Sequence, residues 1–220
     1  MERRAFSPGE MLLLIGVPLV WAILLLFHPG GEGDQIYQDL QDKVTRWQVV
    51  HVGMMLFIPL FAAAVYLLLR GVEGTAALVS RIGLAVFVVF YGAFELLQGI
   101  ATGILVNEVN GLPQIDQATR EELVQNFAEH PLSSNAGVFN IIGGVGLITA
   151  MIGAGVALRR HAGAPRAVLV LLILAGLLIG AHPPPFGPTG LAFFIAAVLL
   201  FQRSQSAAAA PARLSQPDPV

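Results

Sequence analysis

The sequence predicts an all-α fold, namely a polytopic membrane protein that forms a six-transmembrane-helix bundle. Hydrophobic residues make up 55% of the 220 residues and charged residues only 12%, whereas a soluble domain has about 25% charged residues. The mean hydropathy is +0.73. Several apolar segments also approach the roughly 20 residues needed to cross a hydrocarbon core of about 30 Å. These observations indicate a chain that folds within a lipid bilayer.

The apolar segments give the predicted helices in chain order. Each must be helical, because hydrocarbon offers no water to satisfy the backbone N–H and C=O groups. Together they form one predicted domain, residues 1–203. The segment 204–220, rich in Ala, Ser, Gln and Pro, is predicted to be a disordered cytoplasmic tail. The predicted spans are residues 11–27, 48–69, 82–106, 136–158, 167–182 and 188–202.

Basic residues predict the orientation of the bundle, because they collect in cytoplasmic loops. An N-in, C-in arrangement leaves only Lys43, Arg46 and Arg120 outside. Arginine supplies every basic residue except Lys43, a bias typical of GC-rich bacterial genomes. We therefore expect a multi-pass protein of the bacterial plasma (inner) membrane with both termini in the cytoplasm. The cytoplasmic basic residues would be Arg3, Arg4, Arg70, Arg81, Arg159, Arg160, Arg166, Arg203 and Arg213.

Short amphipathic helices are predicted in both outer loops. In segment 34–47, apolar residues recur at helical spacing and Asp34 is a candidate N-cap. Tyr37 and Trp47 would sit at the headgroup level of the membrane, where amphipathic rings are enriched. In the second loop, the segment 119–122 fits a capping box that starts a helix with one apolar side. Both helices are expected to pack on the bundle as interfacial lids.

The last two spans are short for a membrane. The fifth, from Ala167 to Ala181, would be about 22 Å long at 1.5 Å per residue. The connection that follows, from His182 to Pro188, contains four prolines and cannot continue a regular helix. We expect this connection to dip into the outer leaflet, where irregular backbone is tolerated only inside protein or beside a watery cavity. His182 would then lie near the depth of His51.

One polar stripe interrupts the apolar third span. Four polar side chains lie within about 60° of one another at 100° per residue, so the stripe is expected to face the bundle interior. A buried carboxylate in a span is costly and usually has a partner or a function. The outer half of span four could add Asn140 to the same polar cavity. The stripe consists of Tyr91, Glu95, Gln98 and Thr102.

Three histidines on different spans converge on the outer side of this topology. His28, His51 and His182, with Glu95, could bind a transition metal such as Zn, Cu or Fe, because imidazole and carboxylate are suitable ligands. The expected depths differ, since Glu95 lies near mid-membrane and His28 ends its helix. Alternatively, His51 and His182 could be axial ligands of haem b.

Two further functions stay open from the sequence. Glu95 could serve a small transporter or a proton-coupled channel. The chain could also be an accessory subunit without chemistry of its own, in which Glu95 only holds the bundle together. The expected partner is the lipid bilayer. The sequence also leaves open that the chain forms a homo-oligomer or belongs to a larger membrane complex.

Several other chemistries are excluded. The sequence has no cysteine, which removes disulfides, thiolate metal sites and Cys nucleophiles. It has no phosphate-binding loop, and no basic patch indicates nucleic acid. The small residues of span four are instead typical of close helix packing in membranes; they are Gly143, Gly144, Gly146, Ala150 and Ala154.

Four strings resemble those of a group of small, uncharacterised bacterial multi-pass membrane proteins. They are His28-Pro-Gly-Gly31, Arg46-Trp-Gln-Val-Val-His51, Phe94-Glu-Leu-Leu-Gln-Gly-Ile-Ala-Thr-Gly103 and Ala181-His-Pro-Pro-Pro-Phe-Gly-Pro188. This resemblance covers most of the six spans and implies the fold and the membrane location only. A looser analogy is with alkaline-ceramidase and progestin-receptor-type membrane hydrolases, which hold zinc by three histidines in a seven-span bundle. This chain departs from them in its six predicted spans and its lack of a late His-x-x-x-His pair.

Overall fold

The computed structural model describes residues 6–30 and 35–214, and these are helical with no strand. The prediction of an all-α chain is therefore confirmed for the described residues. Five helices are long and apolar enough to cross a membrane: Pro8–Leu25, Val44–Leu68, Thr75–Asn110, Val138–Ala162 and Phe186–Ala207.

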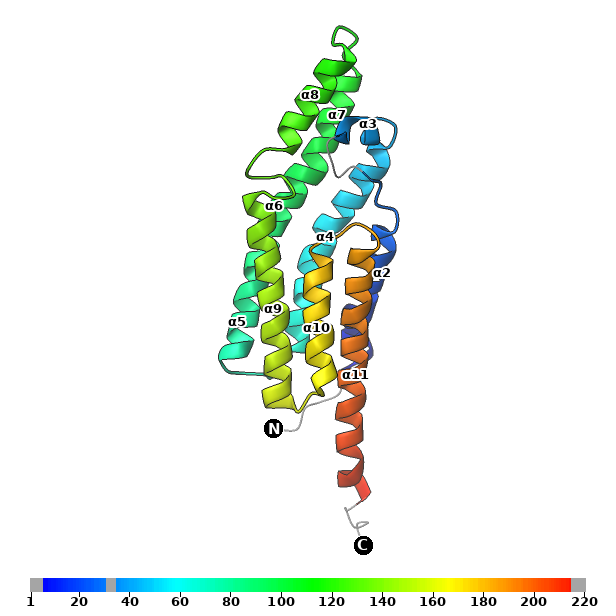
Figure 1. Cartoon of the computed structure of the whole chain (residues 1–220). Helices are drawn as coiled ribbons and strands as arrows, with labels where there is room; N and C mark the ends of the chain where they lie inside the picture. Colours follow the sequence, from blue (N-terminus) through cyan, green and yellow to red (C-terminus); the bar gives the residue numbers. More distant parts are fainter. Residues whose placement is uncertain (1–5, 31–34, 215–220) are drawn as a thin grey trace.

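The helices form an elongated bundle in which α9, α10 and α11 run side by side (Figure 1). The short helices α3 and α8 lie at one end of this bundle, and the described chain begins and ends at the other (Figure 1). The helices of the bundle are α1 (Pro8–Met11), α2 (Val17–Leu25), α4 (Val44–Leu68), α5 (Thr75–Val86), α6 (Gly92–Phe94), α7 (Thr102–Asn110), α9 (Val138–Ala162), α10 (Arg166–Ile179) and α11 (Phe186–Leu214), with α3 (Ile36–Leu40) and α8 (Gln117–Ala128) outside it.

Three stretches within the long helices are π-helical. The π-helix η1 (Leu12–Gly16) joins α1 to α2, whereas η2 (Phe87–Tyr91) and η3 (Glu95–Ala101) flank α6 in the helix 75–110. A π-helix is wider than an α-helix and usually appears as a short insertion at functional sites. The polar residues predicted on this helix fall at or inside η2 and η3, so the local geometry changes where the chemistry-bearing side chains are.

Helix α10 is the short member of the bundle. Its 14 residues give a length of about 21 Å at 1.5 Å per residue, less than a hydrocarbon core of about 30 Å. The chain beyond it turns through the proline-rich connection and re-enters the bundle as α11. The shortness expected for the fifth span is thus a feature of the fold, and His182, in the connection that follows, is buried.

Helices α5 and α9 approach each other closely through small residues. A Cβ atom built on Gly83 would lie 2.6 Å from the carbonyl oxygen of Gly146, which is closer than any real contact. Ser80 donates a hydrogen bond of 2.8 Å from its hydroxyl to the carbonyl oxygen of Ala150. A Cβ on Gly143 would likewise lie 2.6 Å from the backbone nitrogen of Tyr91. We call the α5–α9 contact of Gly83 and Ser80 with Gly146 and Ala150 the glycine seam; the Tyr91 contact lies beyond it, in η2.

A second apolar cluster lies beyond the main core. It joins α3, the start of α4, α7 and α8, and its buried members are Ile36, Tyr37, Leu40, Val44, Trp47, Val106, Val109, Val124 and Ala128. The two outer-loop helices therefore do pack on the bundle. Segment 34–47 is not one helix, however, because the chain turns at residues 41–43 between α3 and α4. The predicted N-cap Asp34 lies outside the described residues.

Two aromatic residues and one helix cap differ in detail from the sequence prediction. Tyr37 and Trp47 are buried in the chain and do not present their rings to lipid; the Tyr37 hydroxyl donates to Asn110 at 2.6 Å. Helix α8 is capped by Asp116 and not by the box at 119–122, since the Asp116 carboxylate accepts from the backbone N–H of Thr119. That hydrogen bond also lowers the pKa of Asp116.

The predicted tail also differs from the structure. Helix α11 continues to Leu214, although residues 204–220 were predicted to be disordered, and in Figure 1 its last part projects beyond the bundle. The physical reason is the run of alanines at 207–210, since alanine has the highest helix propensity. Residues 215–220 lie outside the described part of the chain.

Candidate metal centre

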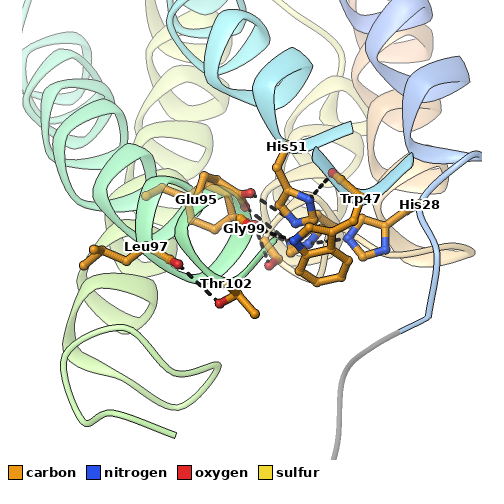
Figure 2. Close-up of polar contacts among 10 residues, drawn as sticks. His28, Trp47, His51, Glu95, Leu97, Gly99 and Thr102 are labelled. Carbon is orange, nitrogen blue, oxygen red and sulfur yellow. Dashed lines mark hydrogen bonds and ion pairs between the residues drawn. The ribbon is translucent and has the colours of Figure 1, made fainter. Parts of the chain in front are cut away.

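Three buried histidines meet near the end of the bundle that carries α3 and α8. His28 follows α2, His51 lies on α4, and His182 lies in the connection between α10 and α11. One nitrogen from each ring lies within 4.8 Å of the others, and all three side chains are buried. Figure 2 shows His28 and His51 pointing toward each other, with Glu95 reaching in from the neighbouring helix.

The spacing of the imidazole nitrogens suits a tetrahedral metal. The Nε2 atoms of His28 and His182 are 3.2 Å apart. In a tetrahedral zinc site with Zn–N bonds of 2.0–2.1 Å, two ligand nitrogens lie about 3.3 Å apart. The largest separation in the triad, up to 4.8 Å, requires the third ring to move inward by about an ångström or more to complete such a site.

The hydrogen bond of His51 determines which of its nitrogens is free to bind. Its Nδ1 lies 2.8 Å from the backbone carbonyl oxygen of Trp47. A carbonyl can only accept, so Nδ1 carries the proton in the neutral ring and Nε2 carries the lone pair. This arrangement, in which the remote nitrogen donates to a carbonyl, is common among metal-binding histidines.

His182 is oriented in the same way by Tyr91. The Tyr91 hydroxyl lies 3.1 Å from the carbonyl oxygen of Gly180 and 3.0 Å from Nδ1 of His182. Because the phenol has one proton and the carbonyl can only accept, the hydroxyl donates to Gly180 and accepts from the Nδ1–H of His182. The Nε2 atom of His182 therefore carries a lone pair and faces His28.

The His28 ring is neutral at physiological pH. Burial lowers its pKa to about 4, although an interaction with the Pro29 backbone opposes this shift. A neutral imidazole has one nitrogen with a lone pair, which is the form that binds metals.

Glu95 stands beside the triad and is fully buried. Its Oε2 atom is 3.8 Å from Nε2 of His51, and its Oε1 atom is 3.7 Å from Nδ1 of His182. The depth mismatch expected between Glu95 and the histidines is therefore absent, because α4 and η3 place His51 and Glu95 at the same level. A cation at this point would be stabilised by the Nε2 lone pair of His51 and by the Glu95 carboxylate.

The other residues predicted for the polar cavity separate into two groups. Tyr91 is part of the site through His182, and Gln98 lines a small cavity of about 10 Å³ together with His51, Glu95 and His182, room for about one water molecule. The Oε1 atom of Gln98 is buried without a hydrogen-bond partner among the described residues.

Thr102 and Asn140 make local contacts instead. The Thr102 hydroxyl lies 3.4 Å from the carbonyl oxygen of Leu97 on its own helix, as Figure 2 shows. The Asn140 amide donates to the carbonyl oxygen of Asn135 at 2.7 Å. The Asn140 amide is thus hydrogen-bonded at the start of α9. The residue that lines the cavity is Asn135.

Trp47 and Gly99 belong to the site and were not among the predicted site residues. The Trp47 ring lies 4.1 Å from that of His51 and 5.2 Å from that of His28, measured between centroids. Its indole N–H donates to the carbonyl oxygen of Gly99 at 2.5 Å. A Cβ atom on Gly99 would lie 2.1 Å from Cδ2 of His51. The signal that could have found Trp47 is its position one helical turn before His51, where i and i+4 side chains meet.

The site has no room for haem. A haem held by His51 and His182 would have to fit its whole porphyrin between the two rings, whose centroids are 6.0 Å apart. The cavity beside them, about 10 Å³, holds far less than a porphyrin. The residues fit a single metal ion and not the macrocycle.

Comparison of the chain with protein-family models, with curated proteins and with solved structures found no match. Its function therefore has to be inferred from the geometry of the site.

Proposed function

We propose that the chain is an integral membrane metalloprotein that holds one transition-metal ion, of the zinc class, through His28, His51 and His182. The single observation that carries this proposal is the tautomer pattern of the triad. His51 and His182 each use Nδ1 to donate a hydrogen bond, so lone pairs are directed toward the place where the three rings meet. The Nε2 atom of His182 lies 3.2 Å from Nε2 of His28, which is about the separation of two ligand nitrogens on one tetrahedral metal ion.

The surroundings of the triad favour a reactive centre over a purely structural one. Structural zinc sites are closed by four protein ligands, whereas catalytic sites use three and keep a position open. Three imidazoles with Glu95 and a water-sized cavity on one side correspond to the second arrangement. A metal ion held there would supply Lewis acidity at its open position. Glu95 is placed to bind the ion or to accept a proton beside it.

We further propose that the bundle crosses the bacterial plasma membrane six times, with both termini in the cytoplasm. The excess of arginine in the loops at one end supports this orientation. The short α10 would count as the fifth span, with the proline-rich connection completing the crossing inside protein. Under this topology, the metal centre lies toward the outer leaflet.

The direct test is metal analysis of the detergent-purified protein after dialysis against zinc. We expect on the order of one ion per chain. His28→Ala, His51→Ala and His182→Ala should each lose the ion, while His130→Ala, an exposed histidine at the same end, should retain it. Size-exclusion chromatography confirms that each variant is folded. A folded wild-type protein that takes up no metal at micromolar zinc contradicts the proposal.

A second candidate function is proton conduction, favoured by the position of Glu95. Its carboxylate lies within 3.8 Å of two imidazoles and lines a cavity that also reaches Asn135 in the outer loop. Intramembrane carboxylates and histidines commonly form proton relays. Flux measured in proteoliposomes should then be abolished by Glu95→Gln, and flux that is unchanged in this variant rules the candidate out.

A further inference from the structure

A groove of about 680 Å³ opens beside the metal centre, along the ends of α2 and α4. This volume falls within the range of about 300–1,000 Å³ that is usual for ligand sites. The groove is next to the triad along the chain, since Phe27 precedes His28 and Val50 precedes His51. It is distinct from the small cavity that Glu95 and Gln98 line.

One wall of the groove is apolar and belongs to the spans. Leu24 and Phe27 contribute to it from α2 and the turn after it, and Val49 contributes from α4. Phe27 and Val49 are 60% and 61% exposed. In a chain that crosses a bilayer, exposed apolar side chains on the spans face acyl chains, so this wall is open to lipid.

The other wall is polar and carries a positive charge. It includes Lys43, Arg46 and Asn107, and also Asp42, so two cations face one anion. Within the described part of the chain, neither Lys43 nor Arg46 makes a salt bridge. These are two of the three basic residues that the proposed topology places outside. Both side chains line the groove and contribute positive charge to it.

We infer that the groove binds one anionic phospholipid of the surrounding bilayer. Its phosphate lies by Lys43 and Arg46, and an acyl chain runs along Leu24, Phe27 and Val49. The arrangement of the two walls supports a phospholipid as the ligand, because the apolar wall lies on the membrane side and the basic side chains lie at the interface. A soluble anion would use only the basic wall, and a purely apolar ligand would use only the other. This inference does not depend on a metal in the triad.

Native mass spectrometry of the purified full chain tests the inference. Phosphatidylglycerol and phosphatidylcholine of the same acyl composition are added at equal concentration, and retained lipid is measured for each. We expect phosphatidylglycerol to be retained several-fold better. Lys43→Gln and Arg46→Gln should each weaken its retention about fivefold, the effect of one basic residue at a lipid surface. Equal retention of the two lipids overturns the inference.

Two matched controls separate the groove from the rest of the surface. Arg120→Gln removes a basic residue on the same side outside the groove and should leave retention unchanged. Val49→Asn should weaken retention, whereas Val145→Asn, at a similarly exposed position on α9, should not. Equal losses in Arg120→Gln and Arg46→Gln would show a general charge effect. Displacement of the lipid by millimolar inorganic phosphate would show a phosphate site instead, and either result refutes the lipid groove.

Discussion

The two parts of the helix 75–110, which we call its first and second halves, are buried for opposite purposes. The first half, α5, forms the glycine seam with α9, where Gly83 admits the backbone of Gly146 and Ser80 hydrogen-bonds to Ala150. The second half contains η2 and η3 and turns Tyr91, Glu95 and Gln98 toward the histidines. The seam brings backbones together with few polar side chains, whereas the metal centre keeps polar side chains apart around a small space.

This difference separates what holds the fold from what serves the site. Changes in the seam should alter the free energy of unfolding and leave metal affinity intact. Changes around the triad should do the reverse, because the second half of the helix contributes its polar groups to a ligand and not to the bundle. Each variant below is therefore to be measured for both quantities.

The largest effect is expected for Gly99→Ala at the metal centre. The added Cβ atom would lie 2.1 Å from Cδ2 and 2.5 Å from Cγ of His51, so the whole imidazole must move away from the triad. Loss of one ligand should lower zinc affinity by at least about 100-fold, as measured by competition with a chromophoric chelator. Gly144→Ala is the control, since a Cβ atom there meets nothing within 4 Å. Wild-type affinity in Gly99→Ala would mean that His51 is not a ligand.

A smaller effect is expected for Tyr91→Phe. The variant keeps the ring but removes the hydroxyl that links His182 to Gly180, so the His182 ring loses the group that orients it. Removal of such a partner usually lowers metal affinity by about 10–100-fold. Tyr37→Phe breaks a comparable hydrogen bond to Asn110 in the second apolar cluster and should leave the affinity unchanged. Equal zinc affinities in the two variants would show that Tyr91 does not orient a metal ligand.

The sequence was sufficient for most of the helices and for the meeting of the three histidines with Glu95, but not for the rest of the site. Hydrophobic length predicted the five helices that are long and apolar enough to cross a membrane, and helical spacing predicted that Glu95 and Gln98 face inward, where both are indeed buried. The short α10 was also evident, because Ala181 is followed at once by prolines. These features depend on local composition, which a sequence displays directly.

The missed features depend on contacts between distant segments. Trp47 was assigned to the headgroups because an exposed tryptophan at a span end is common, and only the approach of Gly99 gives its indole N–H a buried partner. Asn140 was assigned to the cavity from its depth alone, but its amide donates a hydrogen bond to the carbonyl oxygen of Asn135. The π-helical stretches also change the angular positions that a uniform 100° per residue assumes.

The smallest effect is expected for Ser80→Ala in the glycine seam. The variant removes one buried hydrogen bond to the Ala150 carbonyl, and a bond of this kind contributes about 1 kcal/mol. The seam remains closed because the alanine side chain is smaller than serine, so the backbones need not separate. The free energy of unfolding, measured in mixed micelles, should fall by about that amount, with zinc affinity unchanged. A loss of affinity in Ser80→Ala would show that the two halves of the helix are coupled, and that the seam helps to position the metal centre.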